Sequence, residues 1–516
     1  MNDVLLRLRP IAHATPTPTG LHVRGWKSSF TLNGGKGLWT IWERLAGPLA
    51  DGVPPQQLAV PENASPAVAK ALELIITQLW EHDLLVEVPA SWGDEAPPAE
   101  IASWLESVAA APLESWRRLK AATVTVTGEG ALVKAAVRAL TASGLETAVE
   151  AGAGLLLTAG GHAVAAGCAE DVGFVVAPGP RADVIADASA VADRLAGTPG
   201  VPPEVLAALV GSAAAHRLVC AVGGLPDPSV EVVNMWQDVP PPGPPHQAVL
   251  VARVDPLRAD YHPWLSEVRP CEPNGTLLDV LGDAELGPVA TPVPGDLPQL
   301  PVKLAASGAV VGYGTTEHSA RLDALLRATR DLAPDGVVLG ADRTHASGLA
   351  LRTAARDLPG TPVGEDEWST DPTARRWWKA VTLRFGLPAQ VEVTRLHDRV
   401  VRAVVRTGEQ VLSWAVEASA ADAVAFAALA AAGRAQAGHD DTVVLCGAMP
   451  VDAPEGVDAP WTNRDWFWPF GVRDGEEALQ HDLRALLAPA EPKPVSLGPV
   501  VDAAGVVAFA VPEVNR

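Results

Sequence analysis

The chain has 516 residues, of which 48% are apolar and 19% are charged, so it contains enough apolar material for roughly two to four globular domains. Its 39 basic and 61 acidic residues give a net charge of −22, which disfavours binding of the chain as a whole to nucleic acid or to an anionic membrane. The four cysteines form no CxxC pair, and no apolar run reaches the length of a membrane span, so we expect neither a structural zinc site nor a transmembrane helix. The N-terminal MNDVLLRLRP does not resemble a signal peptide, and we expect a cytoplasmic protein.

Residues 1–90 combine short strands with helices. Alternating apolar residues predict strands at 4–9, 21–26, 28–33 and 84–88, with a turn-rich loop between the first two. Helical spacing predicts helices at 36–49 and 66–82, with a short helix between them. This order is typical of a winged helix. The first 50 residues also carry a local positive charge, with Arg24, Lys27 and Lys36 close to the third strand.

Residues 118–255 follow an acidic linker and an amphipathic helix, and their alternating strands and helices predict a doubly wound α/β domain. The turn Gly128-Glu129-Gly130 comes directly after a strand and opens a helix, which is the context of a nucleotide-binding turn, and Glu150 lies about 20 residues further on. However, Val133 occupies the third glycine position, and Glu129 places a carboxylate where a phosphate would lie. We therefore favour a structural turn over a working nucleotide site.

Residues 256–516 predict one further α/β or α+β domain. Helices are expected at 317–333 and 421–436, and strands within 389–407, 442–451 and 505–512. The adjacent pair Glu317 and His318 would diverge on a helix, and no HExxH or HxxxH pair occurs, so we expect no metal site and no catalytic residue. The loop 438–441 is interpreted as solvated, and the aromatic cluster at 461–470 as a domain seam rather than a ligand pocket.

The order of these three parts resembles the ocin-ThiF-like proteins, which act with YcaO cyclodehydratases in azole and thiopeptide biosynthesis. The segment VTVTGEGALVKAAVRALTASGL is similar to the adenylation fold of ubiquitin-activating enzymes, but the third glycine, the ATP-handling charges and the paired zinc cysteines are missing. Residues 310–333 resemble the YcaO segment whose helix ends in magnesium-binding and ATP-binding glutamates. Here Leu326, Arg327, Ala328 and Thr329 stand at that end, followed by Arg330 and Asp331, and the late helix offers only Asp422. The resemblance therefore implies a degenerate adenylation domain and a C-terminal half that is a decayed YcaO scaffold without a cofactor.

The same resemblance implies that residues 1–90 are a recognition element for a precursor peptide. Its third strand would be an open edge to which an extended leader peptide adds a strand, beside the helix at 66–82. The implied peptide-binding residues are Lys27, Ser28, Ser29, Phe30, Thr31, Leu32 and Asn33 of the strand region and Ala71, Ile75 and Gln78 of the helix. In the alternative interpretation, Phe30 and Leu32 pack the core of the module. The turn glycines Gly128 and Gly130 would be vestigial.

These observations predict a non-catalytic subunit that binds a leader peptide and presents the precursor to a separate, ATP-dependent YcaO enzyme. A homodimer through the middle domain is implied by resemblance alone. Two alternatives remain open: an adenylating enzyme that uses Gly128–Gly130, and a winged-helix DNA-binding regulator. The helix at 66–82 and the residue after it offer one lysine and three acids, which makes it a poor reader of a DNA groove.

Overall fold

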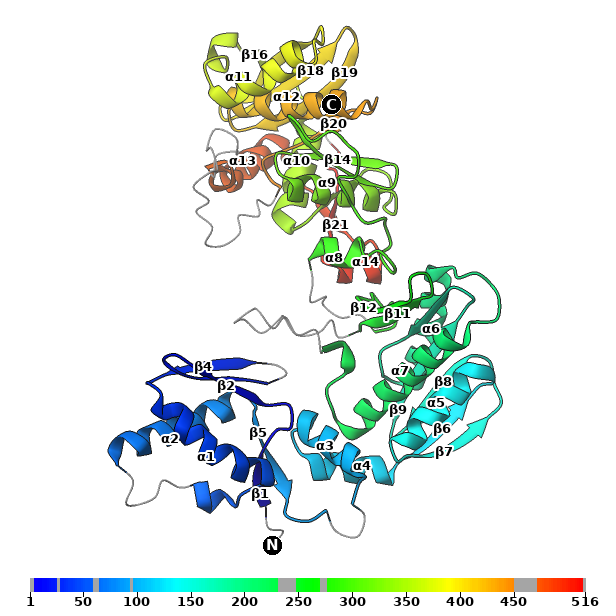
Figure 1. The fold of residues 1–516 in the computed structure, drawn as a ribbon. Helices are drawn as coiled ribbons and strands as arrows, with labels where there is room; N and C mark the ends of the chain where they lie inside the picture. Colours follow the sequence, from blue (N-terminus) through cyan, green and yellow to red (C-terminus); the bar gives the residue numbers. More distant parts are fainter. Residues whose placement is uncertain are drawn as a thin grey trace. The chain divides into compact units, whose positions relative to one another are not determined.

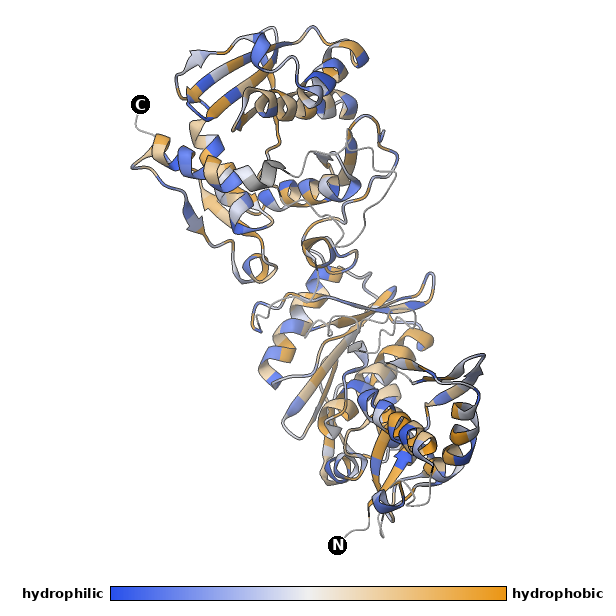
Figure 2. Ribbon diagram, turned by 90° about the vertical axis from the view of Figure 1, so that its left-hand side faces the viewer, coloured by the Kyte–Doolittle hydropathy of each residue, from blue (hydrophilic) through white to orange (hydrophobic). Residues whose placement is uncertain are grey.

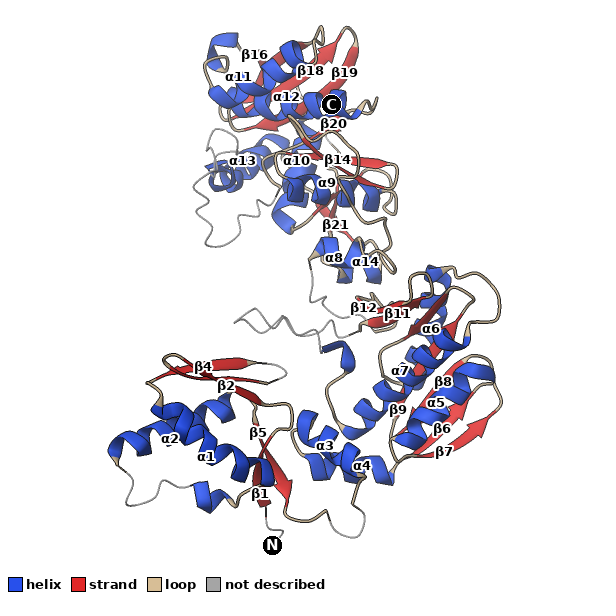
Figure 3. Cartoon of the chain, in the orientation of Figure 1, coloured by secondary structure: helices blue, strands red, loops and turns tan. Residues whose placement is uncertain are grey.

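The computed structural model describes residues 4–25, 28–58, 65–92, 96–230, 247–269, 276–449 and 471–513. The chain divides into two compact units, Met1–His262 and Pro263–Arg516. Both units mix helices with β-sheets, so the predicted multidomain α/β class is confirmed (Figure 3).

The N-terminal module, residues 4–90, contains β1 (Val4–Leu8), β2 (His13–Thr17), β3 (Gly20–Arg24), β4 (Ser29–Asn33), α1 (Gly37–Asp51), a 3-10 helix (Pro55–Leu58), α2 (Pro66–Glu81) and β5 (Leu85–Pro89). Strand β1 pairs antiparallel with β5, and the other strands form an antiparallel sheet in the order β2-β3-β4 that lies across the two helices (Figure 1). The prediction of a loop between the first two strands was wrong, because it contains β2. Pro16 can lie in β2 because β2 is an edge strand and the backbone nitrogen at position 16 faces away from β3, so no ladder hydrogen bond is lost there.

The core of this module forms between the sheet and the helices. Alternate residues of β3 and β4 are buried, and they pack against buried residues of α1 and α2: Leu21, Val23, Phe30, Leu32, Leu38, Trp42, Leu49, Ile75 and Leu79. The short helix expected between α1 and α2 is a 3-10 helix, Pro55–Leu58, so the described residues of this module contain two α-helices and one 3-10 helix. The winged-helix assignment stays a prediction.

Two arginines connect the module to helix α3 (Ala99–Val108): Arg7, which lies in β1, and Arg9, which directly follows β1. Arg7 Nη1 lies 2.7 Å from Glu106 Oε1. The buried Arg9 donates from Nη1 to the carbonyl oxygens of Glu106 and Ala109, both at 2.9 Å, and from Nη2 to Asp83 at 2.7 Å. The N-terminal module is therefore stabilised by contacts with residues that follow position 90 in the sequence.

The second half of unit 1 is built on a seven-stranded sheet. Its elements are α4 (Pro112–Ala121), β6 (Thr123–Thr127), α5 (Gly130–Ala142), β7 (Glu146–Glu150), β8 (Leu155–Ala159), β9 (His162–Cys168), β10 (Val172–Val175), α6 (Arg181–Leu195), α7 (Glu204–Gly223), β11 (Val249–Arg253) and β12 (Arg258–His262). The strand order is β12-β11-β10-β9-β8-β6-β7, and only β6 and β7 are parallel.

The prediction of a doubly wound sheet was therefore wrong beyond the first strand–helix–strand unit. Parallel strands need a crossover of about a dozen residues or more, whereas β8 and β9 are joined by Gly160 and Gly161 alone. Both glycines have positive φ, 57° and 83°, as a tight antiparallel hairpin turn requires.

Helices cover both faces of this sheet. Residues of β6, β8 and β9 such as Val126, Leu157 and Val164 share one core with α5 and α7. The alternate residues point to the opposite face, where α6 packs against β9 and β10. Helix α7 is long and apolar enough to cross a membrane, but most of it is buried against the sheet, as in the core helix of an α/β domain.

Unit 2 contains two-stranded, three-stranded and five-stranded sheets. Its elements are α8 (Leu277–Leu281), β13 (Lys303–Ser307), β14 (Val310–Gly314), α9 (Glu317–Arg330), β15 (Val337–Gly340), α10 (Arg343–Ala355), β16 (Thr361–Pro362), α11 (Pro372–Lys379), β17 (Gln390–His397), β18 (Val400–Thr407), β19 (Gln410–Glu417), α12 (Ala420–Ala437), β20 (Val443–Val444), α13 (Gly471–Leu487), β21 (Lys493–Val495), α14 (Pro499–Ala503) and β22 (Val507–Ala510). The helices predicted at 317–333 and 421–436 are confirmed as α9 and α12.

The largest sheet of unit 2, in the order β16-β17-β18-β19-β20, packs against helices on both faces. Val401, Ala403 and Val405 of β18 face α12, whereas Val400 and Val404 contact the core formed by α10 and α13. Figure 2 shows hydrophobic residues interspersed with hydrophilic ones in the strands and helices of the chain. A turn at Asp398–Arg399 splits the predicted 389–407 segment into the hairpin β17–β18.

Candidate functional site

Strand β4 is one of the two edge strands of the N-terminal sheet, the other being β2. Among the described residues it pairs with β3 alone, in a ladder that places Phe30 opposite Val23 and Thr31 opposite His22. The amides of Gly25 and Gly34 donate across this ladder to the carbonyl oxygens of Ser28 and Thr19, both at 2.9 Å.

The ladder determines which backbone groups face the open edge. Hydrogen-bonded and non-hydrogen-bonded pairs alternate in an antiparallel ladder. Since the pairs Gly25–Ser28 and Thr19–Gly34 are hydrogen-bonded, Phe30 and Leu32 also direct their N–H and C=O groups to β3. The N–H and C=O groups of Ser29, Thr31 and Asn33 consequently point away from β3, toward the open edge.

The side chains of β4 divide between core and surface. Phe30 and Leu32 are each 7% exposed and lie in the core, so they are placed as the alternative interpretation expected. Ser29, Thr31 and Asn33 are exposed. Thr31 Oγ1 lies 2.9 Å from His22 Nδ1, and Asn33 Oδ1 accepts from Thr19 at 2.6 Å. The surface that β4 offers a partner therefore has polar side chains, and its outward backbone groups pair with no strand in the described part of the chain.

The residues predicted on α2 share one helical face. Ala71, Ile75 and Gln78 lie at i, i+4 and i+7, and the C-cap residue His82 continues the series. His82 contacts the strand region, because its ring centroid is 5.0 Å from that of Phe30 and its carbonyl accepts from Ser28 Oγ at 3.0 Å. Ile75 is fully buried, whereas Ala71 and Gln78 are half-buried.

Leu74, 41% exposed, lies one turn from Ala71 and Gln78 and was missed by the sequence analysis, because it lies off the apolar face of α2. Arg24 and Lys36 are exposed close to the two ends of β4. Lys27 lies outside the described residues, as does the aromatic cluster at 461–470. The described members of the predicted set thus belong to one strand and to one face of a helix that touches it.

The glycine turn before α5 is packed against the chain itself. The Gly128 amide donates to the Glu150 carbonyl at 2.9 Å, and a Cβ at position 128 would lie 1.9 Å from the Gly154 carbonyl oxygen. Gly128 also has a φ of 133°. The connection between β7 and β8 therefore gives Gly128 a packing role. Glu129 is exposed beside the first turn of α5, where its charge opposes an incoming anion.

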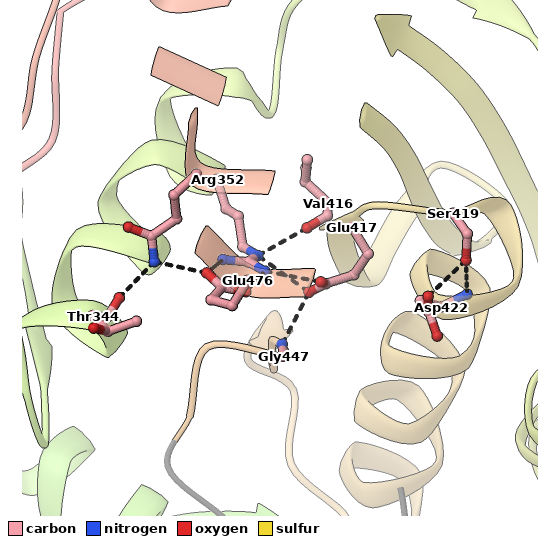
Figure 4. Close-up of polar contacts among 9 residues, drawn as sticks. Thr344, Arg352, Val416, Glu417, Ser419, Asp422, Gly447 and Glu476 are labelled. Carbon is pink, nitrogen blue, oxygen red and sulfur yellow. Dashed lines mark hydrogen bonds and ion pairs between the residues drawn. The ribbon is translucent and has the colours of Figure 1, made fainter. Parts of the chain in front are cut away.

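Unit 2 contains a fully buried ion cluster, formed by Arg352 of α10, Glu417 of β19 and Glu476 of α13 (Figure 4). Arg352 Nη2 lies 2.8 Å from Glu417 Oε2 and 2.6 Å from Glu476 Oε2. The remaining carboxylate oxygens accept from the Gly447 amide at 3.0 Å and from Gln480 Nε2 at 2.8 Å.

Burial acts to lower the pKa of Arg352, but Glu417 and Glu476 outweigh it and raise that pKa above its ordinary value. Burial raises the pKa of the Glu417 carboxyl, although Arg352 opposes this shift. The sequence analysis missed this cluster, because its members lie 65 and 124 positions from Arg352 and share no local motif. Its complete burial favours a structural role.

Asp323 of α9 and Asp422 of α12 have structural partners. Asp323 is buried, accepts from the Tyr313 amide at 2.9 Å and pairs with Arg327 at 2.7 Å. Thr329 is buried at the end of α9 and donates to the Leu325 carbonyl. Asp422 belongs to the cap of α12, where Ser419 donates to it at 2.7 Å. Within the described ranges, no three His, Cys, Asp or Glu side chains gather as a metal site would require.

Comparison with known proteins gives a likeness of fold. No family model and no curated protein matches the sequence. A heterocyclase solved in complex with substrate and cofactor is similar over 99% of this chain and 95% of its own, with 12% identity and a TM-score of 0.50. E. coli MccB solved with AMPCPP and MccA covers 50% of this chain and 96% of its own, with 11% identity and a TM-score of 0.33, which is too weak to assign a fold. The similarity to the heterocyclase indicates that the multidomain α/β fold is shared over 99% of this chain.

Proposed function

We propose that this chain is a non-catalytic subunit of the ocin-ThiF-like type, which binds the leader segment of a ribosomal precursor peptide along β4. It presents the precursor to a separate YcaO cyclodehydratase, which uses ATP to form azolines on the route to azoles or thiopeptides. The complex works in the cytoplasm, and the subunit binds neither nucleic acid nor membrane. A homodimer through the seven-stranded sheet domain belongs to the same proposal.

The observation that carries the proposal is the open edge of β4. Ser29, Thr31 and Asn33 present N–H and C=O groups that no described strand pairs, on a strand whose own core contacts are already made by Phe30 and Leu32. An added strand satisfies such groups without rearrangement of the fold. Each new backbone hydrogen bond contributes about 0.5–1.5 kcal/mol, so a short pairing gives a useful affinity.

Two further observations support the proposal that this chain binds the precursor and a partner enzyme performs the ATP-dependent step. The heterocyclase with a similar fold was solved with a substrate bound, so an architecture of this kind is compatible with binding the substrate of a heterocycle-forming reaction. In this chain the end of α9 offers Thr329, Arg330 and Asp331 rather than a set of glutamates. A magnesium–triphosphate site needs carboxylates, so the ATP-dependent step is assigned to the partner.

Electrostatics favours an acidic leader. Arg24 and Lys36 lie close to the two ends of β4 and are exposed, in a chain whose net charge is −22. Complementary charge raises the association rate and fixes the orientation of the peptide more than it raises affinity. We therefore expect acidic residues in the leader to flank the segment that pairs with β4.

Fluorescence polarisation tests the proposal directly. A labelled leader peptide encoded beside the gene is titrated with the full chain, which keeps the contacts of Arg7 and Arg9 with α3 intact. We expect saturable binding that does not depend on Mg-ATP, and azoline formation only after the partner enzyme is added. A scrambled leader of the same composition is the control for charge alone.

Three results would contradict the proposal. The first is equal affinity for the leader and its scrambled control. The second is azoline formation by this chain alone with Mg-ATP, which would favour an adenylating enzyme. The third is sequence-specific binding to duplex DNA without binding to any leader, which would favour a regulator.

A further inference from the structure

Unit 2 has a cavity on the five-stranded sheet, beyond the C-terminal end of α10. Its volume is about 320 Å³, and its walls come from β17, β18, β19 and the segment Arg356–Pro359 that follows α10. Three of the lining residues are arginines: Arg356, Arg402 and Arg406. We call this cavity and its three arginines the arginine pocket. The cavity is independent of β4, which belongs to the other unit.

Arg402 is the central cation of the arginine pocket. Its Nη1 donates to the carbonyl oxygens of Arg356 and, at 3.0 Å, Leu358, and its Nη2 lies 3.4 Å from Thr394 Oγ1. Its Nε is buried and has no hydrogen-bond partner among the described residues. Arg402 therefore caps the end of α10 and still has an unused donor.

The other two arginines also keep donors free. The Arg356 guanidinium lies 5.7 Å from the centre of the Trp414 ring, and its Nε is 3.4 Å from Asp357 Oδ1. Arg406 Nε donates to Glu392 Oε2 at 3.3 Å. Within the described part of the chain, the terminal amino groups of both arginines have no hydrogen-bond acceptor.

The arginine pocket is a positive site on a strongly acidic chain. Three guanidinium groups face two carboxylates, those of Asp357 and Glu392, which leaves one excess positive charge. Burial lowers the pKa of Arg402 below its ordinary value, opposed by Asp357 and Glu392 and reinforced by the neighbouring arginines. An anion in the cavity would relieve that cost and accept from the terminal amino groups of Arg356 and Arg406.

We propose that the arginine pocket binds a small oxyanion, carried by a carboxylate or a phosphate-type group. Planar guanidinium groups present paired donors to such oxygens, and Arg356, Arg402 and Arg406 surround a cavity large enough for a ligand of several heavy atoms. This makes unit 2 a ligand-binding part of the subunit rather than a bare scaffold.

Isothermal titration calorimetry on the full chain tests this with four probes at matched ionic strength: phosphate, pyrophosphate, succinate and citrate. We expect saturable binding of at least one probe, with a dissociation constant of about 1 mM or below. A preference for phosphate and pyrophosphate identifies a phosphate-type ligand, whereas a preference for succinate and citrate identifies a carboxylate. No saturation by any probe up to roughly 10 mM would overturn the proposal.

Three variants separate a built site from general surface charge. Arg406→Gln removes a pocket cation and should weaken binding about tenfold or more. Glu392→Gln removes a carboxylate from the wall and should strengthen binding about fivefold. The control is Arg395→Gln, because Arg395 lies in the same sheet, is 34% exposed and pairs with Glu367 of a 3-10 helix, much as Arg406 is 35% exposed and pairs with Glu392.

Binding should be unchanged in Arg395→Gln. Equal losses in Arg406→Gln and Arg395→Gln would overturn the proposal, because they would indicate a response to net charge alone. Weaker binding in Glu392→Gln would also overturn it. Leader binding through β4 is measured separately, so failure of this site and failure of the proposed function are distinguishable.

Discussion

Thr31 of β4 lies directly opposite His22 of β3, with Oγ1 2.9 Å from the histidine Nδ1, yet the backbone of Thr31 is not paired with β3. The alternation of an antiparallel ladder turns its N–H and C=O toward the open edge. The side chain and the backbone of Thr31 therefore have different roles. Its side chain belongs to the sheet, and its amide is free for an added strand.

Replacing Thr31 by proline should remove the outward amide while leaving the β3–β4 hydrogen bonds in place. Proline is tolerated at an edge position whose N–H faces away from the sheet. The loss of one hydrogen bond, together with the bulk of the ring at the edge, should weaken leader binding about tenfold or more in fluorescence polarisation.

Thr31→Ala is the matched control for that variant. It also loses the contact with His22 but keeps the amide, so its affinity should stay within about twofold of the parent chain. Similar losses in the two variants would show that the side chain, not the open edge, carries the binding.

Gly128→Ala should destabilise the seven-stranded sheet domain by about 3 kcal/mol or more, because φ is positive and the new Cβ would overlap the Gly154 carbonyl. Gly130→Ala is the comparison. Its φ is 87°, but no atom lies within 4 Å of the new Cβ, so the cost should be about 1–2 kcal/mol. Denaturant unfolding followed by far-UV circular dichroism measures both. Equal costs would argue against a packing role for Gly128.

Arg352→Met should strongly destabilise unit 2. The variant leaves Glu417 and Glu476 buried without their cation, and breaking a buried pair in this way costs about 3–5 kcal/mol. Arg399→Met is a surface control, because Arg399 is 65% exposed and its pair with Asp482 contributes at most about 1 kcal/mol. Denaturant midpoints compare the two. The difference in unfolding free energy between Arg352→Met and the parent chain should narrow at low pH, where the uncompensated Glu417 carboxyl, whose pKa burial raises, takes up a proton. A difference that widened instead would contradict this account.

His345 should make unit 2 sensitive to acid. Burial lowers the pKa of His345 to about 4, from an ordinary value of 6.5, and its Nδ1 accepts from the Ala341 amide at 3.3 Å. A depressed pKa means that the folded state resists protonation, so the stabilisation is complete above pH 6.5 and is lost as the pH falls toward 4. The linked loss is about 3 kcal/mol.

The check for His345 is the unfolding free energy at several pH values between 7 and 4, measured for the parent chain and for His345→Gln. The variant should show a shallower decline over this window. His162→Gln, at an exposed histidine, should follow the parent curve. Parallel curves for all three proteins would contradict the prediction.

Local patterns predicted most elements of the N-terminal module. The alternation in Ser29–Asn33 and the apolar face of α2 are properties of neighbouring residues, so the strand and the helix could be predicted from the sequence. β2 was missed because its sequence, HATPT, contains a proline and lacks an apolar alternation. It folds as a strand because β3 supplies its partner.

Features that depend on distant contacts could not be predicted in this way. The direction of β8 to β10 follows from short connections such as Gly160–Gly161, a signal that is present in the sequence but was not used when the alternating α/β pattern was predicted. The Arg352 cluster and the arginine pocket join residues from separate strands and helices. No local sequence pattern predicts the Arg352 cluster or the arginine pocket.

Residue-resolved hydrogen–deuterium exchange on the full chain, with and without the leader peptide, tests the central claim most directly. The amides of Ser29, Thr31 and Asn33 should exchange much more slowly when the leader is bound, because they gain acceptors. Those of Phe30 and Leu32, already paired with β3, should change little. Leader binding without protection at Ser29, Thr31 and Asn33 would contradict recognition by strand addition at β4.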